Sequence, residues 1–140
     1  MSGILKMDLL NEIVSHPLFK EQYAALQDAE KERRFCTHTM QHFLDVARLM
    51  YIYALEDDLI CEDRLSGELI YAAALLHDIG RYQQLCTGRG HHEAGADLAE
   101  KILKDRGADE EFVLRVTNAI LKHRSECRDE DILAEYLYRA

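Results

Sequence analysis

The segment Leu69–Leu76 is an unbroken run of eight apolar residues that ends at the adjacent pair His77-Asp78. A helix that is apolar on every side is normally buried on every side, so residues from about 65 to 78 are predicted to form a central helix of the fold. The carboxylate of Asp78 then lies at the end of a buried helix. Isolated burial of such a charge is costly, which predicts that a compensating positive charge lies beside it.

Length and composition predict a single all-α domain. The chain has 140 residues with one Pro, seven Gly and no Trp, and it is rich in Ala, Leu, Glu, Lys and Arg. A chain of this length usually forms one domain. We expect a helical bundle in which N-terminal helices in residues 1–34 pack on the same domain as residues 35–140. The absence of a long apolar segment and of a signal-peptide pattern predicts a cytoplasmic protein with no membrane contact.

Breaks in the helical pattern set the expected helix boundaries. The predicted helices span about residues 4–14, 18–34, 37–56, 65–78, 91–106 and 110–124, and a short last one runs from Ile132 to the chain end. Gly107 is expected to follow the end of one helix and Asp109 to cap the next, because these residue types favour those positions. The stretch from Gly80 to Gly90 is predicted to be irregular.

Charge and cysteine content exclude two classes of protein. Seventeen Lys and Arg against 26 Asp and Glu give a formal net charge of −9, which is unsuited to a DNA or RNA surface. A small phosphorylated substrate bound through metal ions is compatible with this charge. The four cysteines form no Cys-x-x-Cys pair, so they are expected to be reduced thiols and not a zinc ribbon. The oligomeric state is left open.

Three histidines fall on or beside the core-facing sides of three different predicted helices. When each helix is wound at about 100° per residue, His123 lies within the apolar stripe that contains Ile120. By the same construction, His91 lies in phase with Leu98 of its own helix. His42 lies beside the apolar stripe of a third helix. These three side chains are therefore predicted to point toward the interior of the bundle.

Together with the pair His77-Asp78, these positions bring potential metal ligands from four helices. Imidazole nitrogens and carboxylate oxygens suit ions such as Zn, Fe, Mn or Co, and an ion would balance the buried carboxylate. A lone histidine on an apolar face is more often a hydrogen-bonded core residue, but four such positions favour a metal site. His16, next to Pro17, is expected to be exposed and structural.

Four segments carry these residues in a fixed order along the chain. They are His42-Phe-Leu-Asp-Val-Ala47, Ala73-Ala-Leu-Leu-His-Asp-Ile-Gly80, His91-His-Glu-Ala-Gly-Ala96 and Ala119-Ile-Leu-Lys-His123. In this order, over about residues 35–124, the chain resembles the HD-domain metal-dependent phosphohydrolase superfamily. The resemblance implies an all-α bundle of the HD-domain type in which His42, His77 and Asp78 coordinate one metal ion. In dinuclear members a second ion is held at positions that His91 and His123 match.

The resemblance also implies a further Asp ligand on a later helix, commonly within an Ala-Asp pair. The chain stops at Tyr138-Arg-Ala140, where such a pair would begin. Asp129 and Asp131 are the only late aspartates, and both precede the expected place. Two interpretations stay open, an HD domain truncated at its C-terminus and a site that water or substrate completes.

The activity that the resemblance implies is hydrolysis of a small phosphoester, such as a nucleotide or a dinucleoside polyphosphate, through a metal-activated water. The cofactor is expected to be one or two divalent ions among Fe, Mn, Zn, Co, Ni and Mg. Asp78 and His77 are the expected catalytic residues, and Asp78 is the candidate to bridge two ions. Two other functions stay open, a non-catalytic metal-binding or regulatory helical domain and a di-iron oxygenase.

Substrate contacts are predicted for residues beside these motifs. A guanidinium binds phosphate through two hydrogen bonds, so Arg81, which directly follows Gly80, is the first candidate. His92 and His38 are candidates for protonating a leaving group or binding phosphate. Further candidates for binding phosphate are Lys122, Arg124 and Arg89.

Overall fold

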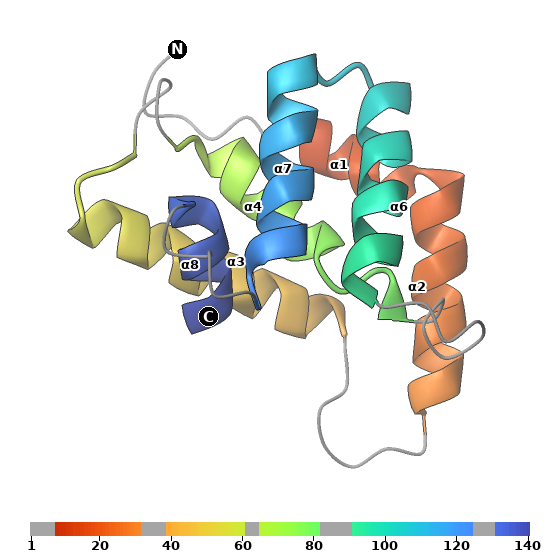
Figure 1. Cartoon of the computed structure of the whole chain (residues 1–140). Helices are drawn as coiled ribbons and strands as arrows, with labels where there is room; N and C mark the ends of the chain where they lie inside the picture. The colour runs from red at the N-terminus through yellow and green to blue at the C-terminus, as the bar shows by residue number, and fades with distance from the viewer. Residues whose placement is uncertain (1–7, 32–38, 61–64, 82–90, 125–130) are drawn as a thin grey trace.

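The computed structural model describes residues 8–31, 39–60, 65–81, 91–124 and 131–140, apart from the side chain of His91. Within these ranges the chain forms seven helices, and its only β-pairing is a single bridge between Ile60 and Leu65 (Figure 1). The helices are α1 (Asp8–Ser15), α2 (Pro17–Glu30), α3 (Met40–Glu56), α4 (Gly67–Leu76), α6 (His91–Asp105), α7 (Glu110–Lys122) and α8 (Ile132–Arg139). The predicted all-α fold is confirmed.

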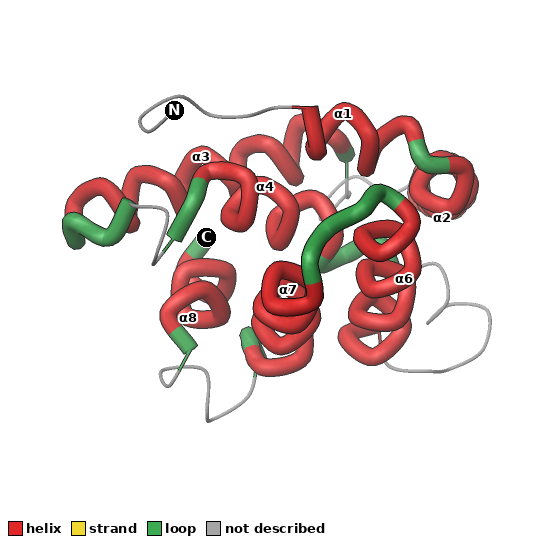
Figure 2. Tube along the Cα trace, turned by 90° about the horizontal axis from the view of Figure 1, so that it is seen from above, coloured by secondary structure: helices red, strands yellow, loops and turns green. Residues whose placement is uncertain are grey.

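Helix α4 is the centre of the bundle. Of its ten residues, all but Glu68 and Tyr71 are buried. It contacts α1, α3, α6, α7 and α8, and Figure 2 shows it enclosed between α1 and α3 on one side and the α6–α7 pair on the other. The Ser66 hydroxyl caps its start by accepting from the Leu69 N–H at 3.1 Å. The predicted central helix is confirmed, and it ends at Leu76, so that His77 and Asp78 lie in the turn that follows.

Helices α6 and α7 form an antiparallel hairpin along one side of α4 (Figure 1). Gly107 follows α6 with a backbone φ of 81°, which glycine adopts without strain. The Asp109 side chain then caps α7 by accepting from the Phe112 N–H at 2.8 Å. Both predicted boundaries are confirmed. The short turn also puts the first turn of α6 and the last turn of α7 at the same end of the bundle.

Other predicted boundaries differ at the ends of the helices. Helix α2 begins at Pro17 and ends at Glu30, earlier than the predicted residue 34. Some predictions fall outside the described residues. They concern the starts of the first and third helices, most of the stretch from Gly80 to Gly90, and all four cysteines. No helix in the described part of the chain is both long and apolar enough to cross a lipid bilayer.

His16 is buried, so the prediction that it is exposed is wrong. Only 8% of its surface is exposed, because the corner between α1 and α2 packs against the C-terminal end of α6. Its Nδ1 accepts from the Leu18 N–H at 3.0 Å and caps α2, and its Nε2 lies 2.8 Å from Asp105 Oδ2. The role of this histidine in the structure is still a packing and capping role.

Candidate metal centre

Three of the predicted ligands come together at one end of α4. His42 lies in the first turn of α3, while His77 and Asp78 follow the last residue of α4. One potential ligand atom from each of the three side chains lies within 4.8 Å of the other two. The arrangement follows from a helix cap and from helix packing, because Thr39 caps α3 just before His42 and α3 packs on α4.

His77 has a hydrogen-bonding pattern that directs one ring nitrogen at Asp78. Its Nδ1 lies 2.7 Å from the Ala74 carbonyl oxygen, which can only accept, so Nδ1 carries a proton. In the neutral ring, Nε2 then presents a lone pair, and it lies 3.0 Å from Asp78 Oδ2. Two electron-rich atoms at this separation repel each other, so a cation or a second proton must lie between them.

The Asp78 carboxylate has a second electrostatic partner. Its side chain is only 6% exposed, and its Oδ1 lies 3.2 Å from Arg81 Nε. Arg81 lies three residues after Asp78, just beyond the turn, and its side chain is partly exposed. One oxygen of the carboxylate therefore faces a guanidinium while the other faces the His77 ring. A positive charge therefore lies beside Asp78, as the sequence predicted, but at only one of its two oxygens.

His123 lies beside this group and repeats the orientation of His77. It is 3% exposed, it caps the end of α7, and its Nδ1 lies 2.7 Å from the Ile120 carbonyl oxygen. Its ring centroid lies 5.7 Å from that of His77, with the two rings perpendicular. Burial lowers the pKa of His123 to about 4. At neutral pH its ring is uncharged, so its Nε2 lone pair is suited to bind a metal ion.

His92 lies closer to the group than its position at the border of an apolar stripe indicated. Its ring centroid lies 4.6 Å from that of His123, because the antiparallel hairpin brings the start of α6 beside the end of α7. Burial lowers the pKa of His92, the Asp78 carboxylate acts in the opposite direction, and Arg124 and Arg81 lower it further. The guanidinium groups of Arg124 and Arg81 therefore lie near enough to His92 to lower the pKa of its ring.

The other predicted site residues are placed as follows. Lys122 is the last residue of α7 and is half-buried, and its contact with substrate stays a prediction. Arg124 is exposed, and its guanidinium carbon lies 5.9 Å from the ring centroid of Tyr138. His91 begins α6, but its side chain lies outside the described part of the structure. Also outside it are His38, Arg89 and Asp129.

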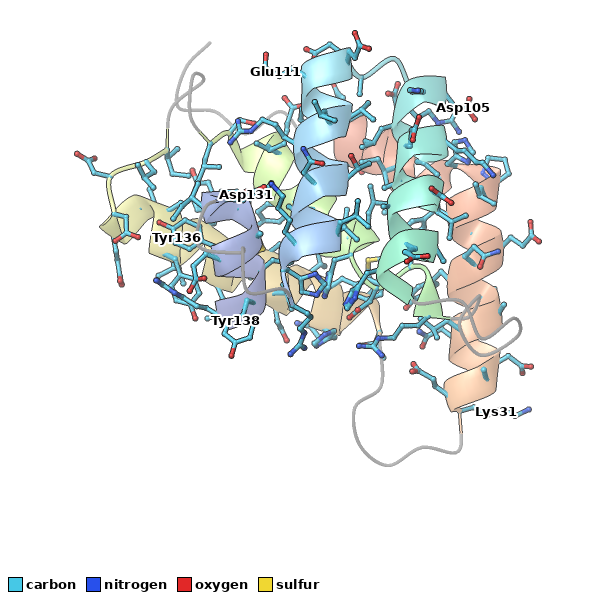
Figure 3. All side chains as sticks on the ribbon, viewed as in Figure 1. Lys31, Asp105, Glu111, Asp131, Tyr136 and Tyr138 are labelled. Atoms are coloured by element: carbon cyan, nitrogen blue, oxygen red, sulfur yellow. The ribbon has the colours of Figure 1, made fainter. Side chains whose placement is uncertain are left out.

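Asp131, one of the two late aspartates, is used as a helix cap. Its Oδ1 accepts from the N–H groups of Leu133 at 3.1 Å and Ala134 at 3.3 Å, at the start of α8 (Figure 3). A carboxylate held by these two donors is oriented toward its own helix. The group that brings His42, His77 and Asp78 together does not contain Asp131.

Sequence reasoning did not identify two residues that shape the centre. The Phe43 ring lies 6.3 Å from the His77 ring and 6.0 Å from the His42 ring, so it packs against both. At Gly95, a Cβ atom would lie 3.4 Å from the His77 carbonyl oxygen, so the absence of a side chain lets α6 approach the end of α4 closely. A glycine between two alanines within an apolar helical pattern was the available signal.

The donor set of the group fits a divalent metal ion. Imidazole nitrogens and a carboxylate oxygen are ligands for Fe, Mn, Zn and Co. The hydrogen bond from the His77 ring to a backbone carbonyl is the arrangement that fixes metal-binding histidines in the correct orientation. The buried contact between His77 Nε2 and Asp78 Oδ2 leaves a requirement for positive charge that such an ion would meet.

Comparisons with known proteins identify the family of this chain. The chain is 33% identical, over 134 residues, to an uncharacterized protein from Clostridium beijerinckii, and the match covers 96% of this chain and 82% of that protein. It also resembles the crystal structure of a "predicted HD superfamily hydrolase" from an uncultured Thermotogales bacterium, with a TM-score of 0.61 and 28% identity. That match covers 94% of this chain and 73% of the other chain. Residues 39–140 match the HD domain, and the chain therefore belongs to the HD domain family.

Proposed function

We propose that this protein is a metal-dependent phosphohydrolase whose substrate is a small phosphoester such as a nucleotide or a dinucleoside polyphosphate. The observation that carries the proposal is the group of His42, His77 and Asp78, in which His77 and Asp78 are buried and the ligand atoms lie within 4.8 Å of one another. Membership of the HD domain family and the likeness to a protein named as a hydrolase support it.

The proposed ligands have distinct tasks. His42, His77 and Asp78 hold one divalent ion, and His91 and His123 are the proposed ligands of a second. A bound ion of this kind acts as a Lewis acid and lowers the pKa of a coordinated water toward neutrality. Asp78 supplies negative charge that offsets the charge of the ions. The burial of His77, Asp78 and His123 keeps bulk water away from these groups.

Arg81 is the proposed contact for the substrate phosphate. In the structure its Nε faces Asp78 Oδ1 at 3.2 Å. An ion bound by Asp78 would replace the guanidinium as the main partner of the carboxylate, leaving Arg81 able to bind a phosphate oxygen. His92, which lies against the His123 ring, and Lys122 are the other proposed contacts. Because the chain is acidic, with a formal net charge of −9, binding of an anion depends on these few cations and the metal.

The proposal is tested by measuring bound metal and phosphate release in matched variants. Wild-type protein, Asp78→Ala, His77→Ala and His16→Ala are purified with Mn²⁺ or Fe²⁺ and analysed for metal by mass spectrometry. Phosphate release is then assayed on nucleoside mono-, di- and triphosphates and on dinucleoside polyphosphates. We expect Asp78→Ala and His77→Ala to lose both bound metal and hydrolysis. The control His16→Ala should change neither, because His16 caps α2 and contacts Asp105 at the end of α6 that is opposite to His92.

Two outcomes would contradict the proposal. Unchanged hydrolysis by Asp78→Ala would show that the reaction occurs elsewhere. A wild-type protein that retains metal but hydrolyses none of these substrates would point to a binding domain. In that case, oxygen consumption by an iron-loaded sample would identify a redox activity of the same centre.

A further inference from the structure

The outward side of α3 carries exposed apolar residues that no described helix covers. The inward side, with Phe43, Val46, Ala47, Met50 and Ala54, is buried on α4 and α8. On the opposite side Leu49 is 42% exposed, Ile52 46% and Leu55 53%. We call the residues Asp45, Arg48, Leu49, Ile52, Leu55 and Glu56 the outer face of α3, and all six are exposed.

Apart from Asp45, the residues of the outer face of α3 are arranged symmetrically about Ile52. At 100° per residue, all six side chains project within about 60° of the direction of Ile52. Leu49 and Leu55 lie three residues before and after Ile52, and Arg48 and Glu56 lie four residues before and after it. Apolar residues are thus matched by apolar residues about this centre, and a cation is matched by an anion.

We propose that the outer face of α3 is the interface of a homodimer, in which two copies of α3 pack antiparallel across a two-fold axis at Ile52. Residues equally far before and after Ile52 then lie at the same level along the paired helices. With a rise of 1.5 Å per residue, Arg48 and Glu56 each lie about 6 Å from the centre. Arg48 is therefore level with Glu56 of the partner subunit, and Leu49 with Leu55 of the partner subunit.

A second copy of the chain fits this face because the charges complement each other only in the antiparallel pairing. The two-fold axis produces the Arg48–Glu56 pairing twice, as an isologous interface requires. In a parallel pairing Arg48 would instead face Arg48 of the partner subunit. The present partner of Arg48 is the neighbouring Asp45 at 3.4 Å, and both side chains are more than half exposed, so this ion pair is weak and easily exchanged.

The dimer is compatible with an accessible metal centre. His42 lies ten residues before Ile52, which is about 15 Å along the helix axis. It is also only half-buried and lies outside the outer face of α3. The interface therefore involves residues that are distinct from the proposed ligands, and the dimer does not depend on the proposed function.

The oligomeric state of the full chain is measured by sedimentation equilibrium over a concentration series, with circular dichroism to confirm folding. We expect wild-type protein to reach a mass twice that of the 16.2 kDa chain, and Ile52→Asp to remain at the single-chain mass. The matched control is Leu114→Asp on α7, because Leu114 is 57% exposed but lies on another helix. The Leu114→Asp variant should dimerise like the wild type.

Charge reversal tests the antiparallel pairing itself. Arg48→Glu and Glu56→Arg should each weaken dimerisation at least about tenfold, since each places like charges level with one another. The double variant Arg48→Glu/Glu56→Arg should restore affinity to within about threefold of wild type, because it exchanges the two signs. If Ile52→Asp fails to fold, these three surface variants still decide the question.

The inference is overturned by any of three results. The first is a wild-type mass of one chain at concentrations up to about 0.5 mM, which would place the dissociation constant above the millimolar range. The second is an Ile52→Asp variant that dimerises as well as wild type. The third is a double charge variant that dimerises no better than the two single ones.

Discussion

Two buried histidines in this fold contact an aspartate through Nε2, and they differ in what lies at the other ring nitrogen. His16 is 2.8 Å from Asp105, and His77 is 3.0 Å from Asp78. The Nδ1 of His16 accepts a hydrogen bond from the Leu18 N–H, so the ring proton is on Nε2 and is donated to Asp105. The Nδ1 of His77 donates to the Ala74 carbonyl, so the proton is on the wrong side for Asp78.

The difference shows why one pair is structural and the other is a candidate ligand pair. The first pair is complete as it stands, with a neutral ring and both nitrogens hydrogen-bonded. Its carboxylate is also stabilised by solvent, because the Asp105 side chain is 63% exposed, against 6% for Asp78. The second pair needs an added positive charge. Both pairs consist of a histidine and an aspartate. The backbone group at Nδ1, an N–H for His16 and a carbonyl for His77, decides where the ring proton lies.

The largest effect expected from this comparison is on metal affinity. Asp78→Asn keeps the size of the side chain and removes its charge, and we expect it to weaken binding of Mn²⁺ or Zn²⁺ more than about 100-fold. Asp105→Asn, the matched change in the other pair, should alter metal affinity less than about twofold because it lies far from the centre. Titration calorimetry on metal-free protein measures both. Equal losses in the two variants would remove the distinction between the pairs.

A smaller effect is expected on stability at the His16 pair. His16→Ala removes the cap of α2 and the bond to Asp105, and should lower the free energy of unfolding by about 1–2 kcal/mol. His16→Asn restores a capping oxygen and should recover part of the loss. Urea unfolding at neutral pH measures both variants. If His16→Ala were as stable as wild type, the pair would have no structural role and the comparison would fail.

The smallest effect is expected at a third pair, in which buried Tyr136 contacts exposed Asp57 and no histidine takes part. The Tyr136 hydroxyl donates to Asp57 and joins α8 to the end of α3 (Figure 3). Burial, and then this hydrogen bond, raise the pKa of Tyr136 to about 12. Because the folded-state pKa lies above the usual value of about 10, the stabilisation is full below pH 10 and is lost as the pH rises through 12.

We therefore expect Tyr136→Phe to lower the free energy of unfolding at pH 7 by about 1 kcal/mol. The same variant should lose less stability than wild type between pH 10 and 12. Thermal unfolding monitored by circular dichroism at several pH values gives both quantities. A wild-type stability that stays constant over this range while Tyr136→Phe declines would contradict the assignment.

Much of the fold could be predicted from the sequence, because it depends on local patterns. The apolar run Leu69–Leu76 indicated a buried central helix, and Gly107 and Asp109 indicated adjacent helix ends. Each of these signals lies within a few residues of the feature that it predicts. That His42, His77 and Asp78 lie together was predicted from the resemblance. The helical pattern alone could not predict it, because these residues come together only when α3 packs on α4.

What could not be predicted depends on partners that are distant in sequence. His16 was expected to be exposed because it lies next to Pro17. The residue that it contacts, Asp105, lies 89 residues further along the chain and could not be identified from the sequence. The ring proton of His77 is fixed by the carbonyl of Ala74, which no residue type reveals. The contact between His92 and His123 arises from the antiparallel pairing of α6 with α7, so the phase of His92 on its own helix underestimated its closeness to the centre.

The enclosure of α4 also has a kinetic consequence. Amide protons in a helix covered by neighbours on all sides exchange with solvent only when the whole domain opens. His77 and Asp78 directly follow this most protected segment, so the distance between them is expected to change only when the whole domain unfolds. Arg124, by contrast, is exposed at the end of the hairpin. Arg124 therefore lacks the protection from local opening that the two residues at the end of α4 have.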